Sequence, residues 1–376
     1  MTLPFLPFTR PTLDEATIQG VVEVLRSGWL ATGPHVARLE AALSDYVGGR
    51  TVRVMTSATA ALEIALLAAG IGPGDEVITP AMSFVATANV IARVGAKPVF
   101  VDVELASRNM DLAQVERVVT PATRALMPVH FAGLPLDMEW LYDLARRHRL
   151  RVIEDAAHAI GSGHPGRRIG SRGDLVCFSF HPNKNMTTLE GGALVADDPA
   201  ELATIDLHRF HGLERHGDGG MEVTLPGGKC NLTDVAARVG LGQLPLLDGF
   251  NDRRRQLAHR YLDLLAGERL LQLPLRGDIG HSWHMVTPLL DLPNLQITRG
   301  QFIDQMRTRG IGVGVHYPAI HLFRYYRGLG YRDGDFPNAE RIGRETVTLP
   351  LFPAMTEADV DRVCAAVREI LAENAR

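Results

Sequence analysis

The sequence lacks the features that mark secreted, membrane-spanning or nucleic-acid-binding proteins. It has three cysteines among 376 residues, far apart and in no metal-ligand spacing, which speaks against a disulfide framework and for a reducing compartment. A formal net charge of −4 gives no basic footprint for nucleic acid. Apolar runs are broken well short of a membrane span. The opening stretch MTLPFLPFTRP has no basic region followed by a long apolar run, so we expect no signal peptide and a cytoplasmic protein.

Internal repeats and low-complexity tracts are missing too, and so is the glycine-rich turn that dinucleotide-binding proteins place after their first strand. The length exceeds that of one ordinary hydrophobic core, which predicts two lobes. We expect a large α/β domain with N-terminal helices over residues 1–240 and a smaller α+β domain over residues 241–376. The boundary falls in a long helical pattern, 231–265, which is broken near Pro245.

Apolar, often β-branched runs alternate with helical patterns along the first half of the chain. Strands are predicted at 51–55, 76–79, 98–101, 125–129, 151–154, 174–180 and 192–196, and intervening helices at 58–69, 83–94, 111–118 and 137–148. A short non-helical link joins the last two strands, so at least one strand is expected to run antiparallel. The pattern predicts an α/β fold with a mostly parallel seven-stranded sheet flanked by helices, which binds ligands at the carboxyl ends of its strands.

The rest of the chain is less regular. Two helices precede the sheet, and the loop between them carries Trp29, which either packs under the loop or forms a wall for a ligand. After the sheet we expect a helix, a glycine-rich loop without motifs, and then a mixture of helices and strands. In order, the predicted segments are helices at 13–25 and 35–46, a helix at 199–208, a loop at 209–230, strands at 283–290 and 311–317, and helices at 299–308 and 356–373.

Polar or reactive side chains follow several of the predicted strands. Ser57, Ala58 and Thr59 open a helix directly after the first strand, a position that favours either an ordinary helix cap or an anion site at the positive end of the helix. Phe84 follows the second strand, where an aromatic side chain is either core or a platform for a planar ring. Asp155 ends a buried strand, where it caps the next turn or meets a cation such as a protonated pyridine nitrogen.

Lys184 is the most distinctive of these residues. It follows a strand that breaks at His181-Pro182, and its flanks HPNKN and TTLEGG are wedged between two apolar strands. A surface lysine is unexpected there. A lysine amine whose pKa is lowered by burial can form a Schiff base with an aldehyde and can move a proton between carbon atoms. An acid and a lysine at neighbouring strand ends therefore predict a cofactor held between them.

The segments TSATAAL, EDAAHA, FSFHPNKN and EGG, in this order, resemble the fold-type I aminotransferases that use pyridoxal 5′-phosphate (PLP). More narrowly, the chain is similar to the DegT/DnrJ/EryC1/StrS family of sugar aminotransferases. The likeness extends from RPTLDE through SGWLATGP, GDEVITPAMSFVATANVI and GKCNLTDVAARVGLGQL to GIGVGVHYPAIHLFRYY and LPLFPAMTEADV. It implies a large PLP-binding domain followed by the smaller C-terminal domain.

The resemblance also implies roles for individual residues. Lys184 would be the Schiff-base lysine, Asp155 the partner of the pyridinium nitrogen, and His158, where many relatives carry Gln, a contact to the ring oxygen or ring face. Further cofactor contacts would come from Phe84, which stacks on the ring, and from Ser57, Ala58, Thr59 and Ser179, which hold the phosphate. Asn231 matches an asparagine that relatives donate to the phosphate across a dimer interface, which implies an obligate homodimer. Residues near the substrate would be Trp29, Lys229, His316 and His321, and no metal is implied.

One branch of this family carries His in place of the lysine and dehydrates its substrate, so Lys184 favours transamination. LPFTRPTLDE, VHFAG, RFHGL, GGKCNLTD, RGIGVGVHY and LPLFPAMT are most similar to the enzymes that form UDP-4-amino-4-deoxy-L-arabinose. They imply transfer from L-glutamate, which leaves as 2-oxoglutarate, to a UDP-4-keto sugar. Two departures from the family pattern leave other acceptors open: a 3-keto sugar, a cyclitol, or a small ketone or amine. Cys230 stands where relatives commonly have an aromatic residue, and the loop 213–228 looks particular to this chain. A PLP-binding regulator without turnover is the alternative from another class.

Overall fold

A computed structural model describes residues 4–164, 167–217, 219–277 and 280–376. Seven strands form its central sheet in the order β1-β9-β8-β5-β4-β2-β3. β9 runs antiparallel to both β1 and β8, and the remaining neighbours are parallel. The predicted α/β fold with a mostly parallel sheet is confirmed. The strands are β1 (Thr51–Met55), β2 (Glu76–Pro80), β3 (Lys97–Val101), β4 (Thr123–Leu126), β5 (Arg151–Asp155), β8 (Leu175–Ser179) and β9 (Gly192–Ala196).

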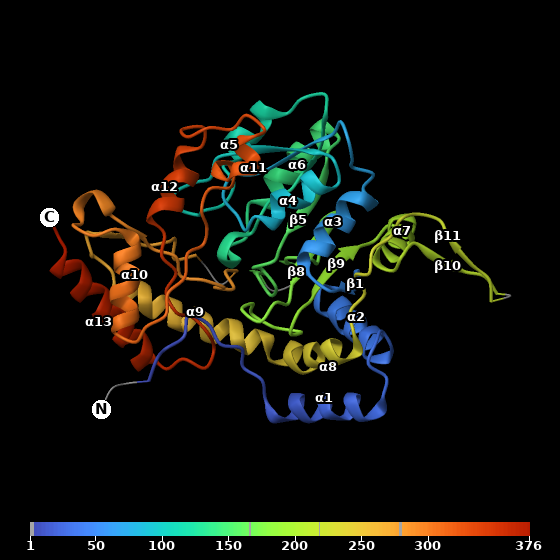
Figure 1. The fold of residues 1–376 in the computed structure, drawn as a ribbon, viewed down its shortest axis with the longest axis horizontal. Coiled ribbons are helices and arrows are strands. Elements are labelled where there is room, and N and C mark those ends of the chain that lie inside the picture. Colours follow the sequence, from blue (N-terminus) through green and yellow to red (C-terminus); the bar gives the residue numbers. More distant parts are fainter. Residues whose placement is uncertain (1–3, 165–166, 218, 278–279) are drawn as a thin grey trace.

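Helices cover both faces of this sheet (Figure 1). Along β8, Leu175 and Cys177 pack into one apolar core, and Val176 and Phe178 pack into the core on the opposite face. All five residues of β8 are buried, which explains why the strand reads as a continuous apolar run. The helices of this part are α1 (Glu15–Ser27), α2 (Pro34–Tyr46), α3 (Ala58–Ala68), α4 (Ala86–Arg93), α5 (Leu112–Val115), α6 (Met138–His148), α7 (Pro199–Arg209) and α8 (Asp234–Gln243).

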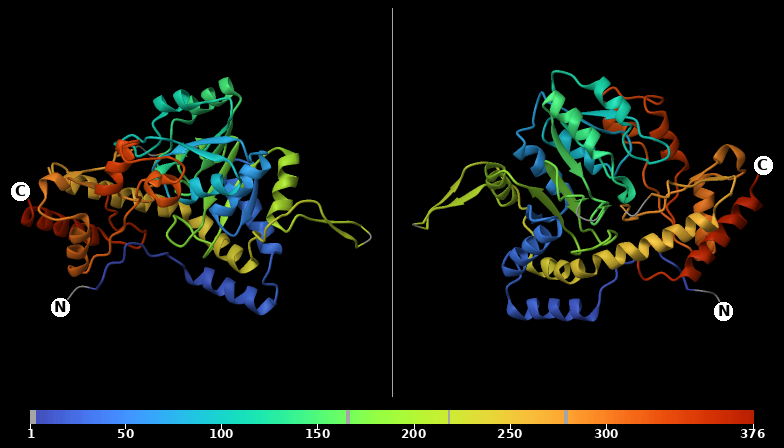
Figure 2. Two further views of the ribbon diagram at one scale, coloured as in Figure 1. Left: turned by 45° about the horizontal axis from the view of Figure 1, so that its top comes forward. Right: turned by 180° about the vertical axis from the view of Figure 1, so that it is seen from behind.

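A long helix, α9 (Leu247–Leu264), leads from below the sheet to the C-terminal part of the chain, where it lies beside α10 and α13 (Figures 1 and 2). Leu257 and Tyr261 of α9 pack there in a separate core, which also contains Leu6 from the N-terminal segment. The domain boundary at residue 240 stays a prediction. The remaining helices are α10 (Arg299–Thr308), α11 (Arg324–Arg327), α12 (Pro337–Glu345) and α13 (Glu357–Glu373). No described helix is long and apolar enough to cross a bilayer.

Three secondary-structure predictions need correction. The segment 209–230, described except for residue 218, is not only loop, because β10 (Leu213–Arg215) and β11 (Met221–Val223) pair as a hairpin that projects from the body (Figure 2). Its strands are short and largely exposed, so they carry no alternating apolar signal. Of the predicted strand 283–290 only β13 (Leu289–Leu290) forms, paired with β12 (Leu271–Gln272). The predicted strand 311–317 is reduced to isolated bridges, such as that between Gly314 and Thr348. A further two-residue pair, β6 (Gly163–His164) with β7 (Arg167–Arg168), lies between β5 and β8.

Strand register brings the chemistry-bearing residues to one edge of the sheet. Gly192, at the start of antiparallel β9, pairs with Ser179 at the end of β8 and with Met55 at the end of β1. Asp155, at the end of the neighbouring β5, pairs with Cys177. The carboxyl ends of three strands and the beginning of a fourth therefore meet, as expected for the ligand-binding edge of such a sheet.

Candidate active site

The turn between β1 and α3 forms one wall of the site. The hydroxyl of Ser57 accepts a hydrogen bond from the backbone N–H of Ala60 at 3.1 Å, so Ser57 is a helix cap. The same turn presents the positive end of α3 to the site. Gly192 lies against it, and a Cβ at that position would be 2.4 Å from backbone atoms of both Ser57 and Ala58. Only glycine permits this approach of the two backbones.

Asp155 provides a buried carboxylate at the end of β5. Its Oδ2 accepts a 2.7 Å hydrogen bond from the hydroxyl of Thr87, and its Oδ1 accepts one of 3.1 Å from the backbone N–H of Ala157. Burial raises the pKa of Asp155, although these hydrogen bonds and the positive charge of Lys184 act in the opposite direction. The effect of burial dominates, so the carboxylate has fewer cationic partners than a buried charge requires.

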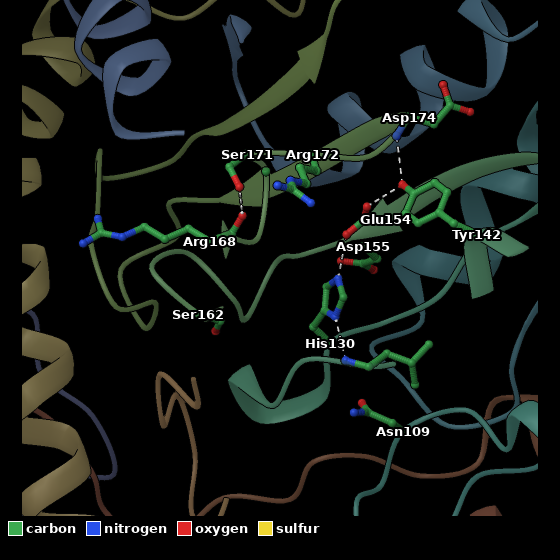
Figure 3. A network of polar contacts seen from close by, with 12 residues as sticks. Asn109, His130, Tyr142, Glu154, Asp155, Ser162, Arg168, Ser171, Arg172 and Asp174 are labelled. Atoms are coloured by element: carbon green, nitrogen blue, oxygen red, sulfur yellow. Dashed lines mark hydrogen bonds and ion pairs between the residues drawn. The ribbon is translucent and has the colours of Figure 1, made fainter. Parts of the chain in front are cut away.

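The neighbouring acid, Glu154, points to other partners (Figure 3). Its carboxylate lies 2.9 Å from Nε2 of His130 and accepts a 2.6 Å hydrogen bond from the hydroxyl of Tyr142. That hydroxyl in turn accepts one of 2.8 Å from the backbone N–H of Asp174. Glu154 is thus satisfied within the protein, and Asp155 is the acid of this pair that faces the site.

Lys184 is held by the turn that follows β8. Its backbone N–H donates to the carbonyl oxygen of His181 at 2.8 Å, and the backbone N–H of Thr188 closes the turn on the carbonyl oxygen of Phe180 at 3.0 Å. The surrounding protein lowers the pKa of the Lys184 amine to about 8, while the negative charge of Asp155 acts to raise it. An amine with such a pKa is partly neutral at physiological pH, which suits both a nucleophile and a general base.

The turn at Ser57, the carboxylate of Asp155 and the amine of Lys184 open onto one cavity of about 330 Å³. Nine of the predicted site residues line it: Ser57, Ala58, Thr59, Phe84, Asp155, His158, Ser179, Lys184 and His316. Half of the Phe84 side chain is exposed there. Nδ1 of His316 lies 2.8 Å from the hydroxyl of Thr348, and burial lowers the pKa of His316 to about 4, so its ring is neutral.

Four predicted residues lie outside this lining. Trp29 is exposed, and its indole N–H donates to the carbonyl oxygen of Thr32 at 3.2 Å. The ammonium of Lys229 donates to the side-chain oxygen of Asn231, whose amide donates to the hydroxyl of Thr32. His321 is fully buried, and its Nε2 lies 3.0 Å from the Glu340 carboxylate. Within its own chain His321 is therefore a packed core residue with a carboxylate partner, and its place near the substrate stays a prediction.

Two functional positions carry no recognisable sequence signal. Thr87, which donates to Asp155, is one of many threonines in a helical segment. Tyr317 lines the cavity beside His316, and its ring lies nearly parallel to that of His158, with centroids 6.0 Å apart. In the sequence, Tyr317 is distinguished only by its place next to His316 in GVHYP.

The side chains around this cavity fit pyridoxal phosphate. The aldehyde requires an amine, which Lys184 supplies. The ring nitrogen, when protonated, is the cation that the under-compensated carboxylate of Asp155 lacks. The phosphate suits the positive end of α3 at the Ser57 turn. This turn packs so closely against Gly192 that a side chain at position 192 would collide with it. The three groups of the cofactor thus find complementary partners around one cavity.

Comparisons with known proteins agree with this fit. Residues 11–368 match the sequence model of the DegT/DnrJ/EryC1/StrS aminotransferase family. The spore coat polysaccharide biosynthesis protein SpsC of Bacillus subtilis (strain 168) is 40% identical over 378 residues, which cover 98% of this chain and 97% of that protein.

Solved structures show the same similarity. Spr1654 of Streptococcus pneumoniae, solved in a PMP form, has a TM-score of 0.92 and 31% identity, over 98% of this chain and 99% of that chain. It is also solved in a PLP form. DesI, solved in the presence of its TDP-sugar product, has a TM-score of 0.87 and 30% identity, over 99% of this chain and 95% of that chain.

Proposed function

Because the chain belongs to the DegT/DnrJ/EryC1/StrS aminotransferase family and is a PLP-dependent enzyme, we propose that it transfers an amino group from L-glutamate to a keto sugar carried on a nucleotide. The acceptor that the sequence favours is a UDP-4-keto sugar. The observation that carries the proposal is that the Asp155 carboxylate, the Lys184 amine and the positive end of α3 converge on one cavity. DesI and its TDP-sugar product support a nucleotide sugar, and SpsC supports a product destined for a polysaccharide.

When bound, PLP acts as an electron sink for the carbanion that forms next to the transferred nitrogen. The residues of the chain determine how that capacity is used. Asp155 keeps a proton on the ring nitrogen, the turn at Ser57 binds the phosphate, and the rings of Phe84 and His158 confine the cofactor. Lys184, with its pKa near 8, takes a proton from the donor carbon and returns one to the acceptor carbon.

The test is a pair of half-reactions on the purified, PLP-loaded protein. Adding L-glutamate alone should convert the absorbance of bound PLP to that of the aminated cofactor, which a regulator without turnover would not do. The aminated protein is then offered UDP- and TDP-4-keto sugars, 3-keto sugars, cyclitol ketones and small ketones. Return of the PLP absorbance identifies the acceptor, and a response to small ketones alone would reject the nucleotide sugar.

The matched variants are Lys184→Ala and Lys97→Ala. Lys97 is exposed and pairs with Glu76 at 2.9 Å, away from the cavity. Lys184→Ala should abolish turnover, and Lys97→Ala should leave it unchanged. Turnover that survives in Lys184→Ala would refute the assigned role of Lys184.

We further propose that the enzyme is a homodimer in which Asn231 serves the partner's cofactor, because Asn231 does not line the cavity of its own chain. Lys184→Ala and Asn231→Ala, each inactive alone, should complement each other when mixed as unfolded chains and refolded together. About a quarter of wild-type activity is expected, since half of randomly formed dimers are mixed and each mixed dimer has one intact site. No recovery in the mixture would contradict a shared site.

A further inference from the structure

The ring of His158 has no nitrogen left for a ligand. The backbone N–H of Ala132 donates to Nδ1 of His158 at 3.3 Å, so Nδ1 is the nitrogen without a hydrogen. Burial, reinforced by the positive charge of Lys184, holds the pKa of His158 well below its ordinary value, so the ring carries one hydrogen. That hydrogen is on Nε2, which lies 3.2 Å from the hydroxyl oxygen of Tyr317.

Tyr317 therefore accepts from His158 and keeps its own hydrogen for another partner. If His158 were the acceptor at Nε2, its Nδ1 would carry the hydrogen and face the N–H of Ala132, donor against donor. With the observed contacts, the O–H of Tyr317 must point away from His158. Tyr317 lines the same cavity as Asp155 and Lys184.

The surroundings keep this hydroxyl protonated and in place. Burial, with a smaller effect from the negative charge of Asp155, raises the pKa of Tyr317 above its ordinary value. Its ring packs near that of Phe84, with centroids 5.8 Å apart, and near that of Phe131, at 6.3 Å. A neutral phenol fixed in this way is a donor and does not act as a base.

We infer that Tyr317 donates a hydrogen bond to a ligand oxygen in this cavity, and that His158 acts through Tyr317 and through its ring face. Two oxygens suit the position: the ring oxygen of the cofactor and an oxygen of the amino acceptor. The second rests on the proposed function, and the first does not. In either case the Nε2 hydrogen of His158 is used by Tyr317, so His158 does not make the ring-oxygen contact implied for it.

The test compares Tyr317→Phe with Tyr331→Phe. Tyr331 is a partly buried tyrosine whose hydroxyl donates to the carbonyl oxygen of Pro98 at 2.8 Å, outside the cavity. Two quantities are measured: the dissociation constant of PLP without substrate, and the rate of each half-reaction. Loss of one neutral hydrogen bond should change the affected quantity roughly three- to tenfold, while Tyr331→Phe matches the wild type.

The outcomes separate the two oxygens. A weaker PLP complex and a shifted PLP absorbance in Tyr317→Phe identify the cofactor oxygen. Unchanged PLP binding with a slower acceptor half-reaction and an unaffected glutamate half-reaction identifies the acceptor oxygen. If PLP binding and the acceptor half-reaction both match those of Tyr331→Phe, the inference is wrong. A wild-type protein that used no nucleotide sugar would defeat only the proposed function, because the PLP measurement needs no substrate and the acceptor measurement uses whichever ketone is accepted.

The role of His158 is tested by a double-mutant cycle. His158→Phe removes the donor that orients the Tyr317 hydroxyl, so the effects of His158→Phe and Tyr317→Phe should not add. The second substitution should cost less in the presence of the first. Fully additive effects would show that the two side chains act independently and would overturn the link between them.

Discussion

The hydroxyl of Thr87, in the first turn of α4, donates a 2.7 Å hydrogen bond to Oδ2 of Asp155 at the end of β5. The same hydroxyl lies 2.9 Å from that of Ser83, so a short polar chain leads from the β2–α4 loop to the carboxylate. Together with the N–H of Ala157, this contact favours the ionised form of a group whose pKa burial raises. The role proposed for Asp155, to keep a proton on the nitrogen of bound PLP, therefore depends in part on a neighbouring helix.

Thr87→Val tests this contact, because it retains the shape of the side chain and removes the donor. Loss of a hydrogen bond to a charged group costs about 1.5–3 kcal/mol, so we expect PLP to bind at least tenfold more weakly. The measurement is PLP titration of the apoprotein. Thr204→Val is the control, since the Thr204 hydroxyl donates to Ala200 on the exposed face of α7. Equal PLP affinity in both variants would mean that the contact is dispensable.

The pKa of Lys184 predicts how PLP uptake depends on pH. Only the neutral amine attacks an aldehyde, and burial lowers the pKa of Lys184 to about 8. The rate at which the apoprotein takes up PLP, followed by absorbance, should therefore rise from pH 6.5, reach half of its maximum near pH 8 and level off about one pH unit higher. A rate that keeps rising to pH 10 would show that the amine has its ordinary pKa.

Gly192→Ala should displace the turn at Ser57, where we propose that the phosphate binds. The added methyl group would lie 2.4 Å from backbone atoms of Ser57 and Ala58, which cannot move without displacing the start of α3. We expect PLP affinity to fall by more than tenfold, or the fold to be lost. Gly249→Ala is the matched control: Gly249 lies exposed in α9 with open space around it. That substitution should stabilise the protein by about 0.5–1 kcal/mol, and near wild-type PLP binding by Gly192→Ala would contradict the predicted close approach.

Buried neutral histidines should make the apoprotein sensitive to acid. Burial lowers the pKa of His281 to about 3 and of His316 to about 4, whereas an unfolded histidine titrates near 6.5. Below pH 6.5 the unfolded state binds more protons, so the free energy of unfolding falls as pH drops towards 4. Each histidine contributes at most about 1.4 kcal/mol per pH unit. Asp155, with its raised pKa, opposes this trend as a single group.

Urea unfolding of the apoprotein at pH 7.5, 6.0 and 5.0 measures this slope. His281→Gln should reduce it, and His216→Gln, on the exposed hairpin, should not. A free energy of unfolding that is constant over this range would exclude the effect.

Hydrophobic patterning was sufficient for the sheet but not for the parts that lack it. The seven strands of the central sheet are apolar runs with both faces covered, so their positions could be read from the sequence. The hairpin β10–β11 could not, because strands of three largely exposed residues have no periodic signal. In the C-terminal part, Val286 and Val313 pack into the apolar core, but the backbone around them forms only isolated bridges. Apolar patterning there reflects burial and does not predict a strand.

The site divides in a similar way. Asp155 and Lys184 can be recognised in the sequence as candidate site residues, because a charged side chain near the end of a buried strand needs a partner. Thr87 and Tyr317 cannot be recognised in this way, because a hydroxyl group gives no signal until its hydrogen-bond partner is known. The His158 ring accepts a hydrogen bond from the backbone N–H of Ala132 and donates one to the hydroxyl of Tyr317, and neither partner is near it in the sequence.

The antiparallel course of β9 also affects how the protein is made. Among the described residues, the only strand that pairs with β1 in the sheet is β9. When residues 51–55 leave the ribosome, they must wait until residues 192–196 have been synthesised before they can pair. Val52 and Val54, buried in the finished protein, remain accessible to chaperones in the meantime. Gly192, at the start of β9, reaches the turn at Ser57 only in that pairing, so this wall of the cavity forms in the same event that adds β1 to the sheet.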